Sequence, residues 1–179
     1  MTDDEAGLIR RACQGHADAR AELINRHQAL VYGLARHLLG RREEAEDVFQ
    51  TVFLKLFEHL STIDPERGLR GWLRKTTVNE CFDCLKTRRR VPGPVDDDAV
   101  AASTVTPPAA AQGSEVERAL REALDALSPS HRATVVLHYM EGLGYAEIAE
   151  TLGVSVETVR SRLKRARAEL RKRLKRYWE

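Results

Sequence analysis

The sequence lacks the features that mark membrane, secreted and disulfide-rich proteins. No apolar run approaches the roughly 20 residues needed to span a bilayer, so we expect no membrane insertion. The start, Met1 to Glu5, has neither the basic nor the apolar stretch of a secretory signal. We therefore expect a cytoplasmic protein whose three cysteines are reduced thiols.

The signatures of an enzyme are also missing. The chain has no glycine-rich phosphate loop, no nucleophile motif and no compact Asp, Glu and His cluster that suggests metal-assisted chemistry. We expect no catalytic residue and no cofactor. One metal alternative stays open, because Cys13, His16, Cys81 and Cys84 would form a tetrahedral zinc set if their helices met. Free cysteines also pack well in small cores, so our prediction is no metal.

Charge is strongly segregated although the net charge is only +2. Positions 155–176 hold ten Lys or Arg against two Glu, and positions 67–90 hold eight against one Glu and one Asp. Four acidic residues lie within positions 43–47. Two basic zones indicate two contacts with nucleic acid.

The stretch from Val91 to Glu117 contains no Lys or Arg and holds four of the six prolines. Such a segment buries little apolar surface, and its prolines prevent a continuous helix. We therefore predict two small all-α domains, residues 1–90 and 114–179, joined by a flexible linker at 91–113.

Limited proteolysis tests this division. We expect the first cuts between about Val91 and Gly113, because exposed polar segments are the preferred sites of nicking. The fragments are separated by size and identified by mass. Resistance of this segment, with earlier cuts inside either predicted domain, would contradict the two-domain division.

Helical periodicity accounts for most of residues 18–90. Asp18 is the predicted cap of a helix that Gly40 ends, a second helix follows over 43–60, and a third runs from Leu69 into the basic stretch near 90. The second helix has an apolar side for the core and an opposite side with Leu54 among polar residues. That opposite side is either an ordinary solvated face or a docking surface.

The carboxyl unit is predicted to end in a helix-turn-helix. Ser114 fits a capping box, and Ser128 with Pro129 forms a second helix start. Glycines at 142 and 144 then precede a short helix over 145–152, Gly153 makes a turn, and Ser155 caps a final helix. This arrangement suits a last helix that enters the major groove of DNA.

The final helix has a packing side and a free side. Its apolar residues share one side, predicted to be Val156, Val159, Leu163, Ala166, Leu170 and Leu174. Arginine and lysine on the other side can contact guanine and phosphates. For Arg171 to Arg176 we favour the simpler interpretation that positive charge complements the helix dipole. Alone, the motif indicates only a DNA-binding protein.

Three runs together resemble the extracytoplasmic-function sigma factors of bacterial RNA polymerase. Residues 45–56 (AEDVFQTVFLKL) resemble the polymerase-docking region, and 69–90 are similar to the part that opens and holds the minus-ten element. The runs 124–129, 145–149 and 159–167 look like the part that recognises the minus-thirty-five element.

The resemblance implies a transcription initiation factor that binds core RNA polymerase and promoter DNA. Because the sequence shows no extension beyond Glu179, it also implies control by an anti-sigma factor or by expression level. The alternative is a stand-alone helix-turn-helix regulator. Trp72 is either a base-stacking partner or a core residue.

The resemblance and the helical faces together nominate three sets of site residues. The predicted polymerase-binding residues are Glu43, Asp47, Gln50, Thr51, Leu54 and Glu58. The predicted minus-ten contacts are Arg67, Arg70, Asn79, Asp83, Lys86 and Arg88. The predicted minus-thirty-five contacts are Ser155, Glu157, Thr158, Arg160, Ser161, Lys164 and Arg165.

Overall fold

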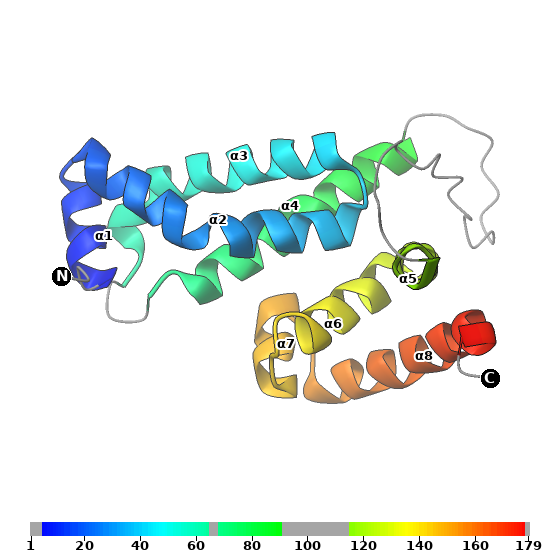
Figure 1. Ribbon diagram of the computed structural model, residues 1–179. Helices are drawn as coiled ribbons and strands as arrows, with labels where there is room; N and C mark the ends of the chain where they lie inside the picture. The colour runs from blue at the N-terminus through cyan, green and yellow to red at the C-terminus, as the bar shows by residue number, and fades with distance from the viewer. Residues whose placement is uncertain (1–4, 65–67, 91–114, 178–179) are drawn as a thin grey trace. The chain divides into compact units, whose positions relative to one another are not determined.

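The computed structural model describes residues 5–64, 68–90 and 115–177 (Figure 1). Within these ranges the chain forms helices and turns and no strand, as the sequence predicts. The contacts divide it into two compact units, 1–88 and 89–179. The all-α fold with two units is thereby confirmed, while the linker predicted at 91–113 lies outside the described residues. None of the described helices is both long and apolar enough to span a bilayer.

The first unit is a helical bundle. Its elements are α1 (Glu5–Cys13), α2 (Ala17–Leu39), α3 (Arg42–His59), the 3-10 turn η1 (Leu60–Thr62) and α4 (Arg70–Arg90). Gly40 ends α2 as predicted: it adopts a left-handed φ of 74°, and its N–H donates to the carbonyl of Arg36. The chain then reverses, so that α3 runs back along α2 (Figure 1).

The core of the first unit comes from the apolar stripes of its helices. Leu23 and Leu34 of α2, Leu56 of α3 and Leu73 of α4 are almost completely buried. Burying such a side chain contributes about 1.5–3 kcal/mol. Helical spacing of these residues is therefore the main reason that the four helices pack as they do.

Two details at the start of the chain differ from the sequence prediction. Asp18 is not a cap, because α2 begins at Ala17 after His16 and no side chain caps it. Asp18 instead pairs with Arg11, which joins α2 to α1. Helix α1 itself was not predicted, since nine residues give too short a periodic pattern to identify.

The second unit is built around its last helix. Its elements are α5 (Glu115–Asp125), α6 (Pro129–Tyr139), α7 (Tyr145–Leu152), α8 (Val156–Leu174) and the 3-10 turn η3 (Lys175–Tyr177). Helices α5, α6 and α7 each pack against α8. The predicted start of α6 is confirmed, because the Ser128 hydroxyl accepts from the N–H of His131 and Pro129 occupies the first turn. The capping box predicted at Ser114 lies outside the described residues.

Candidate polymerase and nucleic-acid interfaces

The outward side of α3 carries all six residues of the predicted docking face. Most are exposed, and Thr51 is half-buried. Leu54 is the most exposed large apolar side chain in the described chain, at 65%. The Thr51 hydroxyl donates to the carbonyl of Asp47 at 2.9 Å. The surface is therefore an acidic face with one exposed leucine at its centre.

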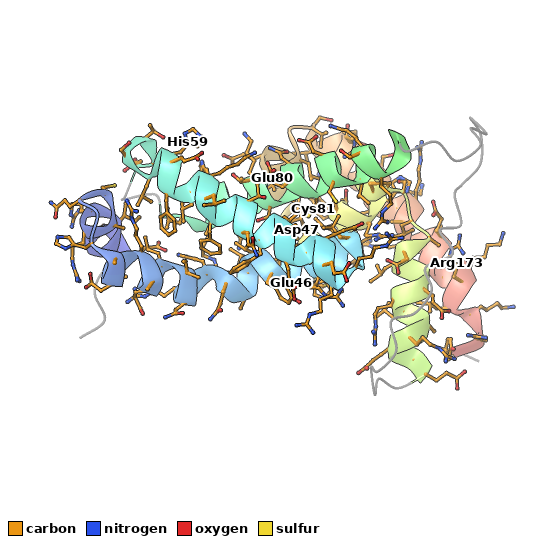
Figure 2. The ribbon with its side chains drawn as sticks, turned by 90° about the horizontal axis from the view of Figure 1, so that it is seen from above. Glu46, Asp47, His59, Glu80, Cys81 and Arg173 are labelled. Atoms are coloured by element: carbon orange, nitrogen blue, oxygen red, sulfur yellow. The ribbon has the colours of Figure 1, made fainter. Side chains whose placement is uncertain are left out.

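Helix α3 is held from two sides, which keeps this face outward. Toward α2, the ring of Phe49 meets Tyr32 edge-on at 6.3 Å between centroids. Toward α4, Lys55 Nζ lies 2.5 Å from Glu80 Oε1, so that Glu80 faces α3 (Figure 2). Both contacts flank the exposed strip without covering it.

The predicted minus-ten residues of α4 separate into two groups. Asn79, Asp83 and Lys86 are exposed and share one side of the helix by spacing. Lys86 donates to the Asp83 carboxylate at 2.8 Å, and this hydrogen bond and charge lower the pKa of Asp83. Arg70 is exposed at the first position of the helix. Arg67 lies outside the described residues.

Arg88 lies on a different side of α4, where it contacts α3. Its guanidinium donates to both carboxylate oxygens of Glu44, with Nη2 2.7 Å from Oε1 and 2.5 Å from Oε2. Both side chains are mostly shielded, at 28% and 21% exposure. This geometry gives Arg88 a structural role between α3 and α4, and its contact with DNA stays a prediction.

Replacing Arg88 tests that structural role. Arg88→Ala is expected to lower the free energy of unfolding by about 2 kcal/mol, because a charge-assisted hydrogen bond is lost and the Glu44 carboxylate stays partly buried. The measurement is denaturant unfolding of the full chain. Lys75→Ala, an exposed change on the same helix, is the control and should shift stability by less than about 0.5 kcal/mol. An unchanged stability for Arg88→Ala would remove the structural role.

The connection between α7 and α8 follows local sequence signals. The Gly144 N–H donates to Glu147 Oε2 at 2.9 Å, which fixes the start of α7. Gly153 adopts a φ of 63° at its end, a conformation that glycine adopts without strain. The Ser155 hydroxyl accepts from the N–H of Thr158 at 3.1 Å and caps α8. The predicted helix-turn-helix is thus present with its predicted turn and caps.

The packing side of α8 is as predicted over the middle of the helix, whereas Leu170 and Leu174 farther along are half-buried. Val159, Leu163 and Ala166 are buried at 1% exposure or less, and Ile148 of α7 is buried as well. Val156 was predicted to pack but is 37% exposed. It is the first residue of α8, one turn before the segment that the other helices cover.

The opposite side of α8 presents the predicted minus-thirty-five residues. Glu157, Arg160, Lys164 and Arg165 are exposed, whereas Thr158 and Ser161 are half-buried. Arg160 Nη1 lies 3.4 Å from Glu157 Oε2. An exposed pair of this kind contributes little to stability, so Arg160 can exchange Glu157 for another partner.

Arg167 is a residue of this helix that the sequence analysis missed. Its Nε donates to the Tyr139 hydroxyl at 2.6 Å, and its guanidinium lies 5.6 Å from the centroid of the same ring. The hydrogen bond raises the pKa of Arg167. The contact ties α8 to the end of α6. No local pattern could reveal it, since the two residues are 28 positions apart.

The four residues of the zinc alternative do not form a metal site. Across residues 5–64, 68–90 and 115–177, no group of three or more His, Cys, Asp or Glu is placed to hold a metal ion. Cys81 is buried within α4 (Figure 2), whereas Cys13 is exposed at the end of α1. Burial raises the pKa of the Cys81 thiol, which disfavours the thiolate that a metal needs.

Comparison with known proteins agrees with this geometry. Residues 23–91 match the family model of sigma-70 region 2, and residues 117–170 match that of sigma-70 region 4. These segments contain α3 and α4, which carry the predicted docking and minus-ten residues, and the helix-turn-helix of the second unit. Each predicted interface therefore falls within a matched region.

Individual relatives show the same resemblance over most of the chain. SigE, an ECF sigma factor of Mycolicibacterium smegmatis, is 40% identical over 153 residues, which are 84% of this chain and 59% of SigE. SigM of Mycobacterium tuberculosis is 31% identical over 169 residues, 93% of this chain and 82% of SigM. The solved structure of RpoE with the anti-sigma factor NepR, from Bartonella quintana, matches with a TM-score of 0.70 and 25% identity, covering 87% of this chain and 96% of RpoE. The chain belongs to the extracytoplasmic-function (ECF) family of RNA polymerase sigma factors.

Proposed function

We propose that this sigma factor binds core RNA polymerase through the exposed face of α3 and directs initiation at specific promoters. The observation that carries the proposal is Leu54, which is 65% exposed at the centre of an acidic helix face. A singly exposed leucine is normal on a protein surface, but this one lies at the centre of an acidic face on a helix within the segment that matches sigma-70 region 2, which favours a partner that covers it. A partner bound there would contact the exposed face of α3 and would not disturb the packing of its buried side.

Promoter contacts are assigned to two other helices. On α4, Arg70, Asn79, Asp83 and Lys86 are exposed and would contact the minus-ten element, with Arg67 as a further candidate from the sequence. On α8, the exposed Arg160, Lys164 and Arg165 would recognise the minus-thirty-five element in the major groove. Ser161 is half-buried beside them, and Glu157 and Thr158 lie near the capping residue Ser155.

The domain boundaries and setting complete the proposal. Residues 1–90 would form the polymerase-docking and minus-ten domain, 91–113 the linker and 114–179 the minus-thirty-five domain. The protein would act in the cytoplasm, where polymerase and promoter DNA are found, and would catalyse no reaction itself. A separate anti-sigma factor would control it, because the matched RpoE structure contains such a partner.

In vitro transcription with purified core polymerase tests the proposal. The chain added to core polymerase should start transcription from a subset of promoters that core polymerase alone does not use. A stand-alone regulator would instead bind duplex DNA without polymerase and would not associate with it in a pull-down. Failure to bind core polymerase would therefore favour the regulator over the sigma factor.

A further inference from the structure

Glu5 connects three parts of the first unit through one carboxylate. It lies in the first turn of α1, and its Oε1 is 2.7 Å from Nε2 of His27 on α2. Its other oxygen, Oε2, lies only 2.6 Å from the position that a Cβ on Gly68 would occupy. Gly68 lies two residues before α4. The carboxylate is thus packed between α2 and the segment that leads into α4.

His27 is buried in a way that simple packing does not explain. It is 4% exposed, and its Nδ1 has no hydrogen-bond partner among the described residues. An ionised carboxylate only accepts hydrogen bonds, so Nε2 of His27 donates to Glu5, while Nδ1 of the same ring is a buried polar atom. Burying a polar atom without a hydrogen-bond partner is unfavourable. In return, the hydrogen bond from His27 holds the Glu5 carboxylate in one orientation.

Gly68 is fitted to this carboxylate. Its φ of 68° is in the left-handed region, which strongly favours glycine, and a Cβ there would displace the Glu5 carboxylate from its present position. Directly after it, Leu69 is completely buried. The close approach of Glu5 and the burial of Leu69 both fall where α4 begins.

Helix α1 packs against α2 and η1 through its apolar side (Figure 1). Ile9 and Ala12 are completely buried there. This packing fixes the position of α1 against α2 and η1, so that Glu5 in its first turn lies close to Gly68. Arg70 and Trp72 follow within four residues of Gly68, at the start of α4.

We propose that Glu5, held by His27, is a positioning residue for promoter opening: it fixes the amino end of α4 and with it Arg70 and Trp72. The inference rests on the proposed function of α4 in minus-ten recognition. It assigns a role to α1, a helix outside the segment that matches sigma-70 region 2. Glu5 itself is not proposed to touch DNA.

The first test compares two variants that each remove a contact of α1. Glu5→Ala removes the contact with His27 and Gly68, whereas Asp18→Ala removes the ion pair with Arg11 that joins the same two helices. With reconstituted holoenzyme, Glu5→Ala should reduce open-complex formation on the order of tenfold, the effect of losing one charge-assisted hydrogen bond. Asp18→Ala should leave it within about twofold. Binding to core polymerase should be unchanged in both.

Fluorescence gives a readout of position that does not depend on polymerase. The chain has two tryptophans, so Trp178→Phe leaves Trp72 as the only one. In this background Glu5→Ala should shift the emission of the half-buried Trp72 to longer wavelength, and Asp18→Ala should not. If the parent chain fails to bind core polymerase, the proposed function fails while this comparison still tests the positioning.

Substitutions at two further positions, His27 and Gly68, separate positioning from simple stability. His27→Gln keeps an N–H donor near the position of Nε2 and should retain most of the parent's open-complex formation. His27→Leu has no such donor and should behave like Glu5→Ala. Gly68→Ala should also be impaired, because it strains the left-handed backbone and displaces the Glu5 carboxylate, and adding Glu5→Ala should then cause little further loss. The proposal is overturned if Glu5→Ala and Asp18→Ala lower thermal stability alike without a difference in Trp72 emission or open complexes. Equal loss of core binding and promoter opening in Glu5→Ala would also overturn it.

Discussion

Leu54→Arg is expected to weaken binding to core RNA polymerase on the order of a hundredfold or more, the scale of a central interface residue. The leucine is the apolar centre of an otherwise acidic face. An arginine in its place would lose the apolar contact and would be buried away from water in the complex. Its charge would also repel a partner whose surface complements negative charge. Asp47→Arg on the same face should have the same direction of effect. The fold should not change, because both side chains point away from the core.

The measurement is the affinity of purified variants for core polymerase, with helical content checked by circular dichroism. Gln28→Arg is the matched control: it places the same charge at an exposed position of α2, outside the docking face. It should bind polymerase as the parent does. Normal binding by Leu54→Arg and Asp47→Arg, with unchanged helical content, would show that α3 does not provide the docking surface.

Local sequence signals were sufficient to predict the helix-turn-helix. Gly153 is in the left-handed conformation, and Ser155 caps the next helix through its own hydroxyl. Each signal acts within four residues, so it can be identified in the sequence without knowledge of the fold. The predicted short helix over 145–152 therefore coincides with α7.

Contacts between distant residues could not be predicted in this way. The pairs Glu5 with His27 and Arg88 with Glu44 join residues 22 and 44 positions apart. Helical spacing states which side of a helix is polar, but not which partner a polar side chain meets there. Arg88 was consequently grouped with the DNA contacts, although the structure places it against α3.

End effects explain the remaining differences. The periodic pattern of α8 includes Val156, yet that residue is exposed because packing begins one turn later. Asp18 has the residue type of a cap but lies inside the first turn of α2, where it pairs with Arg11. Terminal positions of helices depend on what lies beyond them, which periodicity does not describe.

Changes on the exposed face of α8 should alter promoter choice and not only promoter affinity. Arg160 and Arg165 lie on the side of α8 opposite the buried Val159 and Leu163, where arginine can form two hydrogen bonds with a guanine edge. If Arg165 makes such a contact, Arg165→Ala should cost about 1–3 kcal/mol at one base pair and relax preference at that position. Arg160→Ala should act similarly at a neighbouring base pair, since Glu157 holds its guanidinium only weakly.

The controls for this prediction are Arg171→Ala and Lys172→Ala, both exposed near the end of the same helix. Their positive charge is interpreted as complementing the helix dipole, so their loss should leave promoter preference unchanged. Any phosphate contact they make carries no sequence information, and its loss would weaken all promoters by a similar factor. Transcription by reconstituted holoenzyme over a library of upstream elements separates the two kinds of effect, because preference and overall strength are measured together. A preference that shifts in the controls but not in Arg160→Ala or Arg165→Ala would place the reading face nearer the carboxyl end of α8. Since Arg167 is tied to Tyr139 between these two groups of residues, that result would also mean that the helix enters the groove beyond the point where α6 holds it.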